Sequence, residues 1–388
     1  MDKQWYDNNP CHIKQNSKLI GKVCTALLIL FCHASFAQSL KKNSIDFNIN
    51  NAATLEIKVD LLIDAGNKSL ENDKSNLAKR YYERAVTDGI KLGKHPSYAS
   101  ALTKLANLQE NKITARSLYQ NSLDIYEELY GPRDLNNAHV LDDIVWTYDY
   151  SGSDTELAID QIKRSIVIRR YHKDYQTLPA NLRTLAWLYE IKNDYKKAET
   201  NYREALNIDL RILGFNDIRV ILSMENLAQF FIDIGEFKKA EGVLWDKRKR
   251  HKAAKYIDYY NLGRSESMLA WVYLKLGKDG TAEYHFINAL NNIKESMNDP
   301  SDSPSFPALP ALLDLIAYYA NKQQFDKARI YYDQAQNILS EAGDGSLADH
   351  AQFIENEILS GNGASYTWSA DYQIDGIRLM IDYALKNN

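Results

Sequence analysis

The 388-residue sequence is poor in cysteine, and its few cysteines lie at one end. All three of them, Cys11, Cys24 and Cys32, precede Gln38. Removal of the segment before Gln38, which is argued below, would leave a chain without any thiol. Such a chain forms no disulfide, no thiolate metal site and no cysteine nucleophile.

Proline and concentrated positive charge are also scarce. The chain has only 8 prolines, which suits a mostly helical protein because proline interrupts helices. The formal net charge is −4, and the only basic run is Lys247–Lys252. Binding to phosphate backbones needs a clustered positive face, so nucleic acid is not expected as a main partner. An anionic polysaccharide or a lipid headgroup at the basic run is kept as an alternative.

Motifs for catalysis and cofactor binding are absent from the sequence. It contains no Gly-x-Ser-x-Gly, phosphate loop or Rossmann fingerprint, and its histidines are scattered. The pair Asp142 and Asp143 is adjacent on a helical pattern, where neighbouring side chains point about 100° apart. We expect a solvated face there. The sequence therefore predicts a non-enzymatic protein with no catalytic residue, cofactor or metal.

The first 37 residues have the layout of a secretory signal peptide. Lys14, Lys18 and Lys22 precede the apolar run Val23–Cys32, and Ser35 and Ala37 supply small residues at the −3 and −1 positions of a cleavage site before Gln38. The apolar run is too short for a spanning helix, which needs about 20 residues. We expect export to the periplasm or the outside of a bacterial cell, with no transmembrane helix after cleavage.

A repeating pattern of small and large residues organises the rest of the chain. Seven alanines recur every 37 to 46 residues, and each is followed four residues later by a large apolar residue: Ala78, Ala115, Ala158, Ala198, Ala240, Ala282 and Ala328. Small and bulky residues one helical turn apart allow close helix packing. In the most regular copies an aromatic residue stands nine residues before the alanine: Tyr189, Phe231, Tyr273 and Tyr319.

Three segments carry a resemblance to a known family. Residues 185–199, 227–241 and 269–283 share the pattern Leu-Ala-x-apolar-aromatic followed by an Ala-Glu pair, and this pattern resembles tetratricopeptide repeats. The period near 42 residues and the turn Leu92–Ala99 are similar to the kinesin-light-chain variety. The resemblance implies an all-α, right-handed superhelical solenoid of antiparallel helix pairs whose concave groove binds peptide segments of other proteins.

These patterns divide the chain into four parts. We expect a signal peptide at 1–37, a flexible segment at 38–52, seven repeats at 53–342 and capping helices at 343–388. A closing element of this kind covers the last apolar face of a solenoid.

Candidate partner-binding residues lie on the first helices of the repeats. Three tryptophans directly follow the small residue of that helix: Trp146, Trp187 and Trp271. They would either line the groove as ligand platforms or pack on the next repeat as core, and the sequence leaves both open. Polar candidates are Arg183, Thr184, Glu225, Asn226 and Gln229, for which a solvated salt-bridging face is the alternative.

The expected function is an exported interaction scaffold or adaptor that binds a protein or peptide partner. Two other functions stay open. A carbohydrate-binding or envelope-polysaccharide-associated protein would stack sugars on the tryptophans, and a periplasmic chaperone would bind many peptides weakly.

Overall fold

The computed structural model describes residues 45–150, 152, 154–214, 217–253, 257–297, 306–342 and 378. The proposed signal peptide and the predicted capping helices, apart from Arg378, lie outside the described residues. The described part contains 15 α-helices and no strand. The chain divides into two compact units, Met1–Tyr171 and His172–Asn388, called unit 1 and unit 2 below.

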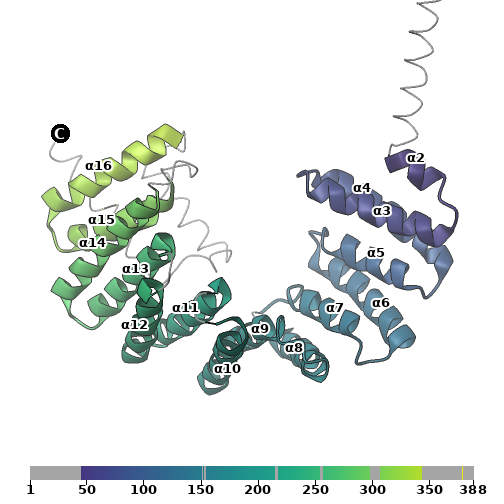
Figure 1. The fold of residues 1–388 in the computed structure, drawn as a ribbon, viewed down its shortest axis with the longest axis horizontal. Helices are drawn as coiled ribbons and strands as arrows, with labels where there is room; N and C mark the ends of the chain where they lie inside the picture. The colour runs from purple at the N-terminus through teal and green to yellow at the C-terminus, as the bar shows by residue number, and fades with distance from the viewer. Residues whose placement is uncertain are drawn as a thin grey trace, which may run out of the picture. The chain divides into compact units, whose positions relative to one another are not determined.

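The described part of unit 1 contains the short helix α2 and three antiparallel helix pairs (Figure 1). Helix α2, Ile45–Asn50, lies within the predicted flexible segment 38–52, and its Ile49 is buried in the core formed with α3 and α4. The pairs are α3 (Leu55–Leu70) with α4 (Ser75–Gly89), α5 (Pro96–Ala106) with α6 (Lys112–Tyr130), and α7 (Leu135–Val145) with α8 (Asp154–Tyr171).

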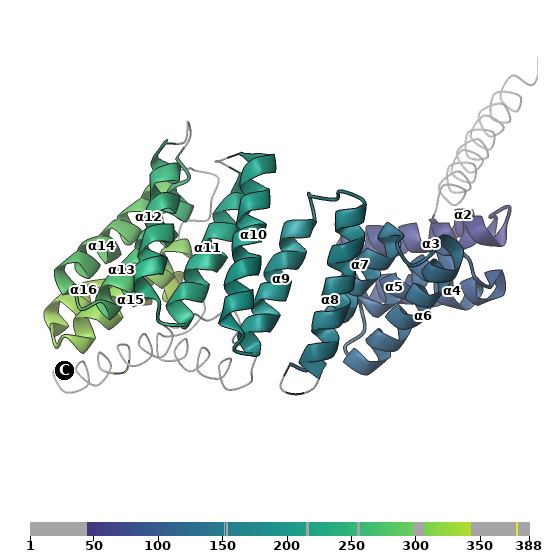
Figure 2. The ribbon, with the colours of Figure 1, turned by 90° about the horizontal axis from the view of Figure 1, so that it is seen from below.

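The described part of unit 2 contains four more pairs, whose helices run side by side in both views (Figures 1 and 2). The pairs are α9 (Leu178–Ile191) with α10 (Tyr195–Leu213), α11 (Ile218–Asp233) with α12 (Phe237–Ala253), α13 (Tyr259–Lys275) with α14 (Asp279–Ser296), and α15 (Leu309–Asn321) with α16 (Phe325–Ala342). Within each unit, the second helix of one pair packs on the first helix of the next pair: α4 on α5, α6 on α7, α10 on α11, α12 on α13 and α14 on α15.

The turn inside each pair of unit 2 has one shared geometry. One residue of each turn adopts a left-handed conformation with φ between 56° and 76°: Asn193, Gly235, Gly277 and Gln323. The amide of the following residue donates to the carbonyl of the aromatic residue that the repeat pattern singles out: Tyr189, Phe231, Tyr273 or Tyr319. This hydrogen bond closes the end of the first helix, and glycine and asparagine tolerate the conformation best.

The repeated alanines and large apolar residues form the core of the pairs. Ala198, Ala240 and Ala282 are fully buried, and so is Phe286 four residues after Ala282. The start of a first helix is capped by an aspartate where one is present, as when Asp258 Oδ1 accepts from the Asn261 amide at 2.9 Å. The predicted fold class, an all-α solenoid of antiparallel helix pairs, is confirmed. Among the described helices, none has the length and apolarity of a membrane span.

Candidate functional site

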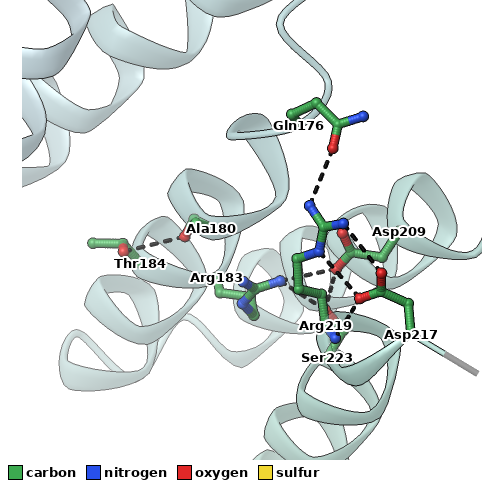
Figure 3. A network of polar contacts seen from close by, with 8 residues as sticks. All are labelled: Gln176, Ala180, Arg183, Thr184, Asp209, Asp217, Arg219 and Ser223. Atoms are coloured by element: carbon green, nitrogen blue, oxygen red, sulfur yellow. Dashed lines mark hydrogen bonds and ion pairs between the residues drawn. The ribbon is translucent and has the colours of Figure 1, made fainter. Parts of the chain in front are cut away.

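The first helices of unit 2 carry most of the predicted binding residues, and several of them bond to other helices. Arg183 on α9 donates from Nη1 to Asp209 Oδ2 on α10 at 2.9 Å and to Ser223 Oγ on α11 at 2.7 Å (Figure 3). Ser223 in turn donates to Asp209 Oδ2 at 2.5 Å. The Asp209 side chain is 4% exposed. Arg183 thus links two consecutive helix pairs through a buried carboxylate.

A second ion cluster follows one pair later. Glu225 on α11 accepts from Lys247 Nζ on α12 at 2.8 Å and also pairs with Arg264 on α13. The Lys247 side chain is fully enclosed, and burial lowers its pKa against the opposing effect of the Glu225 charge. In this pair the acid stands on the first helix and the base on the second, the reverse of Arg183 and Asp209.

The remaining polar candidates differ in whether their side chains form hydrogen bonds within the described residues. Thr184 donates its hydroxyl to the Ala180 carbonyl at 3.2 Å, and Gln229 donates from Nε2 to Asp233 Oδ1 at 2.7 Å. Asn226 is exposed, and its side chain has no hydrogen bond to any described residue. Of the five polar candidates, Asn226 therefore offers the most available amide.

The sequence left open whether the tryptophans line the groove or pack in the core, and the structure places Trp271 and Trp187 differently. Trp271 is 3% exposed, donates from Nε1 to Asp314 Oδ1 at 3.1 Å, and meets the Phe286 ring edge-on with centroids 5.3 Å apart. It packs between its own pair and α15, so it follows the core alternative and is closed to a ligand. Trp187 on α9 is only partly buried, which leaves part of its ring accessible.

Trp146 belongs to unit 1 and lies directly after the last residue of α7. It is the C-cap residue of that helix and is 55% exposed. Because α7 ends at Val145, Trp146 stands beyond the helix rather than on its face.

The acidic pair of unit 1 is not the solvated face that the sequence indicated. Asp142 pairs with the enclosed guanidinium of Arg169 on α8. Burial raises the pKa of Asp143 to about 6, and the charge of Asp142 adds to the shift. The two carboxylates point to different surroundings, and no group of metal-ligating side chains occurs among the described residues.

Sequence patterns alone missed three participants in these clusters. Each of them lies on a helix face that is otherwise apolar: Asp209, Ser223 and Lys247. A polar residue at such a position is the sequence feature that could have indicated a buried polar contact. A charged residue on a buried stripe needs a partner, because burying an unpaired charge is costly. The partner itself lies 14 to 40 residues away in the chain.

Comparison with known proteins places the fold. No family model matches the sequence, and neither does any curated protein. The structure is similar to the apo form of the quorum sensor NprR from B. thuringiensis, with a TM-score of 0.52 and 15% identity over 94% of this chain and 99% of that one. It is similar to the apo form of RapI, with a TM-score of 0.50 and 14% identity over 84% and 86% of the two chains.

A third similar structure contains a tetratricopeptide repeat sensor. It is a signal transduction ATPase with numerous domains and a tetratricopeptide repeat sensor from Pyrococcus horikoshii, with a TM-score of 0.51 and 15% identity over 78% of this chain and 48% of that one. The chain has the tetratricopeptide-repeat fold. At these identities the likeness concerns the arrangement of tetratricopeptide helix pairs alone.

Proposed function

We propose that the protein is a non-enzymatic interaction scaffold that holds a peptide segment of a partner protein along α9 and α11. The observation that carries the proposal is the exposed Asn226 amide, which lies beside the fixed Glu225 on the first helix of its pair. A primary amide donates and accepts hydrogen bonds at once, as a peptide backbone requires. The tetratricopeptide fold supports this proposal, because stacked first helices form an extended surface.

The neighbouring residues have two kinds of role in this proposal. Trp187 supplies an aromatic contact and Thr184 a polar one, at the positions of α9 that correspond in the repeat pattern to Gln229 and Asn226 on α11. Arg183 and Glu225 act as positioning residues, because their ion pairs hold α9, α11 and their neighbours in register. Preorganised surfaces bind with less loss of conformational freedom.

A peptide-display selection on the purified protein tests the proposal. We expect selected peptides to share a consensus and to lose at least tenfold in affinity for the variant Trp187→Ala/Asn226→Ala, since tryptophan contacts often contribute more than 1 kcal/mol. The control is Ile113→Ala/Asn76→Ala, which changes an exposed apolar residue and an exposed amide in unit 1. Equal binding by parent and Trp187/Asn226 variant would overturn the placement.

The outcome of the selection also separates the other functions. Enrichment of one consensus supports an adaptor, whereas many unrelated peptides bound weakly would indicate a chaperone. Failure to enrich peptides, together with retention of envelope polysaccharide, would replace the scaffold with a carbohydrate-binding protein.

Export is part of the same proposal and rests on the N-terminal segment. The lysines before the apolar run, the run Val23–Cys32 itself and the Ser35–Ala37 site support cleavage before Gln38. Expression in a bacterium with export machinery should yield an extracytoplasmic protein whose first residue is Gln38 by mass spectrometry. Recovery of the intact N-terminus in the cytoplasm would contradict export.

A further inference from the structure

Helix α12 presents a tryptophan and three basic residues on a single face. The basic residues Arg248, Lys249 and Lys252 follow Trp245 by three, four and seven residues. This spacing places the four side chains along one stripe of the helix. Together with Asp246 they line a hollow of about 400 Å³. This face, here called the α12 face, belongs to a second helix and contains none of the residues invoked above for peptide capture.

Some of the basic side chains in the run Lys247–Lys252 form ion pairs in the structure, whereas others are exposed and form none with a described residue. Lys247 is enclosed and paired with Glu225, and Arg250 donates twice to Asp246 Oδ2, at 2.9 and 2.7 Å. Lys249 and Lys252 are both exposed, and neither forms an ion pair with a described residue. The α12 face therefore carries two uncompensated positive charges on a chain whose net charge is −4.

Contacts behind the helix hold the Trp245 ring in place. Its Nε1 donates to Tyr273 Oη at 2.9 Å, and that hydroxyl donates to Glu241 Oε1 at 2.7 Å. The ring also meets His285 edge-on, with centroids 5.9 Å apart. Trp245 nevertheless remains 39% exposed. An exposed ring that is already fixed loses little conformational entropy when a ligand covers it.

Arg248 is fixed next to this ring. Its guanidinium carbon lies 4.8 Å from the Trp245 ring centroid, and its Nε donates to the buried carboxylate of Glu266 at 2.6 Å. His285 lies 2.6 Å from the other oxygen of the same carboxylate. The α12 face thus combines an aromatic and guanidinium pair that is held by hydrogen bonds with two exposed lysines. Tryptophan and arginine are the residues most enriched among binding hot spots.

We propose that the α12 face binds an acidic peptide segment that carries one large apolar side chain beside several carboxylates. The apolar side chain packs on Trp245, and the carboxylates pair with Lys249 and Lys252. Pairing at a partly exposed surface gives steering and selectivity for acidic sequences.

The hydrogen-bonding character of the hollow favours a peptide over a sugar chain. Sugar hydroxyls need acceptors as well as donors. Among the described residues, Asp246 is the one carboxylate that lines the hollow, and its Oδ2 already accepts twice from Arg250. Carboxylates of an acidic peptide need donors only, and Arg248, Lys249 and Lys252 are donors. A nucleic-acid strand would need a longer positive track than this single helix face supplies.

The length of the α12 face sets the spacing within the ligand. Trp245 and Lys252 are seven residues apart, or about 10.5 Å along the helix axis. An extended peptide covers this distance in about three residues. The apolar residue and the last of its acidic neighbours should therefore stand about three positions apart.

Fluorescence anisotropy on the full-length protein tests the assignment. The probe is a labelled peptide with one phenylalanine followed by a run of glutamates, and its control replaces every glutamate by glutamine. We expect the variant Lys249→Gln/Lys252→Gln to bind the glutamate probe about tenfold more weakly, since each exposed pair contributes up to about 1 kcal/mol. The glutamine probe should bind parent and variant alike, and added salt should weaken only the glutamate probe.

Matched variants separate the α12 face from general electrostatics. Lys112→Gln/Lys196→Gln removes two lysines that are also exposed and unpaired among the described residues, and it should bind like the parent. Trp245→Ala should weaken both probes. Unchanged binding by Lys249→Gln/Lys252→Gln, equal loss in the lysine control, or preference for a polyuronate oligosaccharide over the glutamate probe would each overturn the proposal. These variants leave α9 and α11 unchanged. The experiment can therefore contradict binding at the α12 face without contradicting the peptide site proposed on α9 and α11.

Discussion

Lys247 and Glu225 form an ion pair inside unit 2, with Nζ 2.8 Å from Oε2 and the lysine side chain fully enclosed. The corresponding position one pair earlier and one pair later on the second helix is alanine, Ala205 or Ala289, and both are buried. A charge therefore occupies a place that usually holds a small apolar residue. A buried pair of this kind tolerates joint replacement better than the loss of one member.

Removing only the acid should destabilise the protein strongly. Glu225→Gln leaves the Lys247 ammonium enclosed without a counter-charge, and we expect a loss of about 3–5 kcal/mol in the free energy of unfolding by urea titration. The double variant Glu225→Leu/Lys247→Met should recover most of that loss. As a control, Lys238→Ala removes an exposed partner of Glu241 and should cost less than about 1 kcal/mol. A mild effect of Glu225→Gln would show that water reaches Lys247.

Trp187 and Trp271, the two candidate binding tryptophans in unit 2, should respond differently to truncation. Trp271→Ala removes a buried ring that contacts Phe286 and Asp314, and we expect a loss of about 3–5 kcal/mol in stability. Trp187→Ala should cost clearly less, because its ring is only partly buried. Thermal and urea unfolding of the two single variants measure the difference. Equal losses would place Trp187 in the core as well.

The helix pairs themselves were predictable because their signals are local. The spacing of Ala198, Ala240 and Ala282, with an aromatic residue nine positions before each, marks one face of each helix. Glycine at Gly235 and Gly277 marks the turns, and these are the positions where the backbone is left-handed. Local signals of this kind need no knowledge of distant contacts.

The fate of each candidate site residue was not predictable, because it depends on partners far along the chain. Trp187 and Trp271 occupy the same place in their repeats, yet Trp271 is buried and donates to Asp314, 43 residues away, whereas Trp187 is only partly buried. Arg183 likewise donates hydrogen bonds to Asp209 and Ser223, which lie on two other helices. A sequence shows which residues are able to pair, whereas the packing of neighbouring pairs selects the ones that do.

Gly263 on α13 should resist replacement even by alanine, although alanine favours helices by about 1 kcal/mol over glycine. A Cβ atom there would lie 2.9 Å from the Ala289 carbonyl oxygen and 2.6 Å from Ile293 Cγ1 on α14. A backbone oxygen does not move aside easily, so we expect Gly263→Ala to lower the unfolding free energy by about 1–3 kcal/mol. Gly242→Ala on α12 is the control, since nothing lies within 4 Å of its Cβ position, and it should be neutral or stabilising.

Glu190 should make the stability of unit 2 depend on pH near neutrality. Burial raises the pKa of Glu190 to about 7, Asp233 adds to the shift, and the hydrogen bond from Tyr202 at 2.6 Å opposes it. A carboxyl group whose folded pKa exceeds its unfolded value of 4.5 binds its proton more tightly in the folded state. Its stabilising contribution is complete below about pH 4.5 and is lost as the pH rises through about 7.

The variant Glu190→Gln should remove this dependence, because glutamine stays neutral and its carbonyl still accepts from Tyr202. Between about pH 4.5 and 8, the parent should lose on the order of 2 kcal/mol relative to Glu190→Gln, with the variant the more stable of the two at pH 8. Urea titrations of both proteins across this range measure the difference, in which other titrating groups such as Asp143 cancel. Parallel curves for the two proteins would mean that Glu190 is ionised in the folded protein throughout, with its charge solvated at the end of α9.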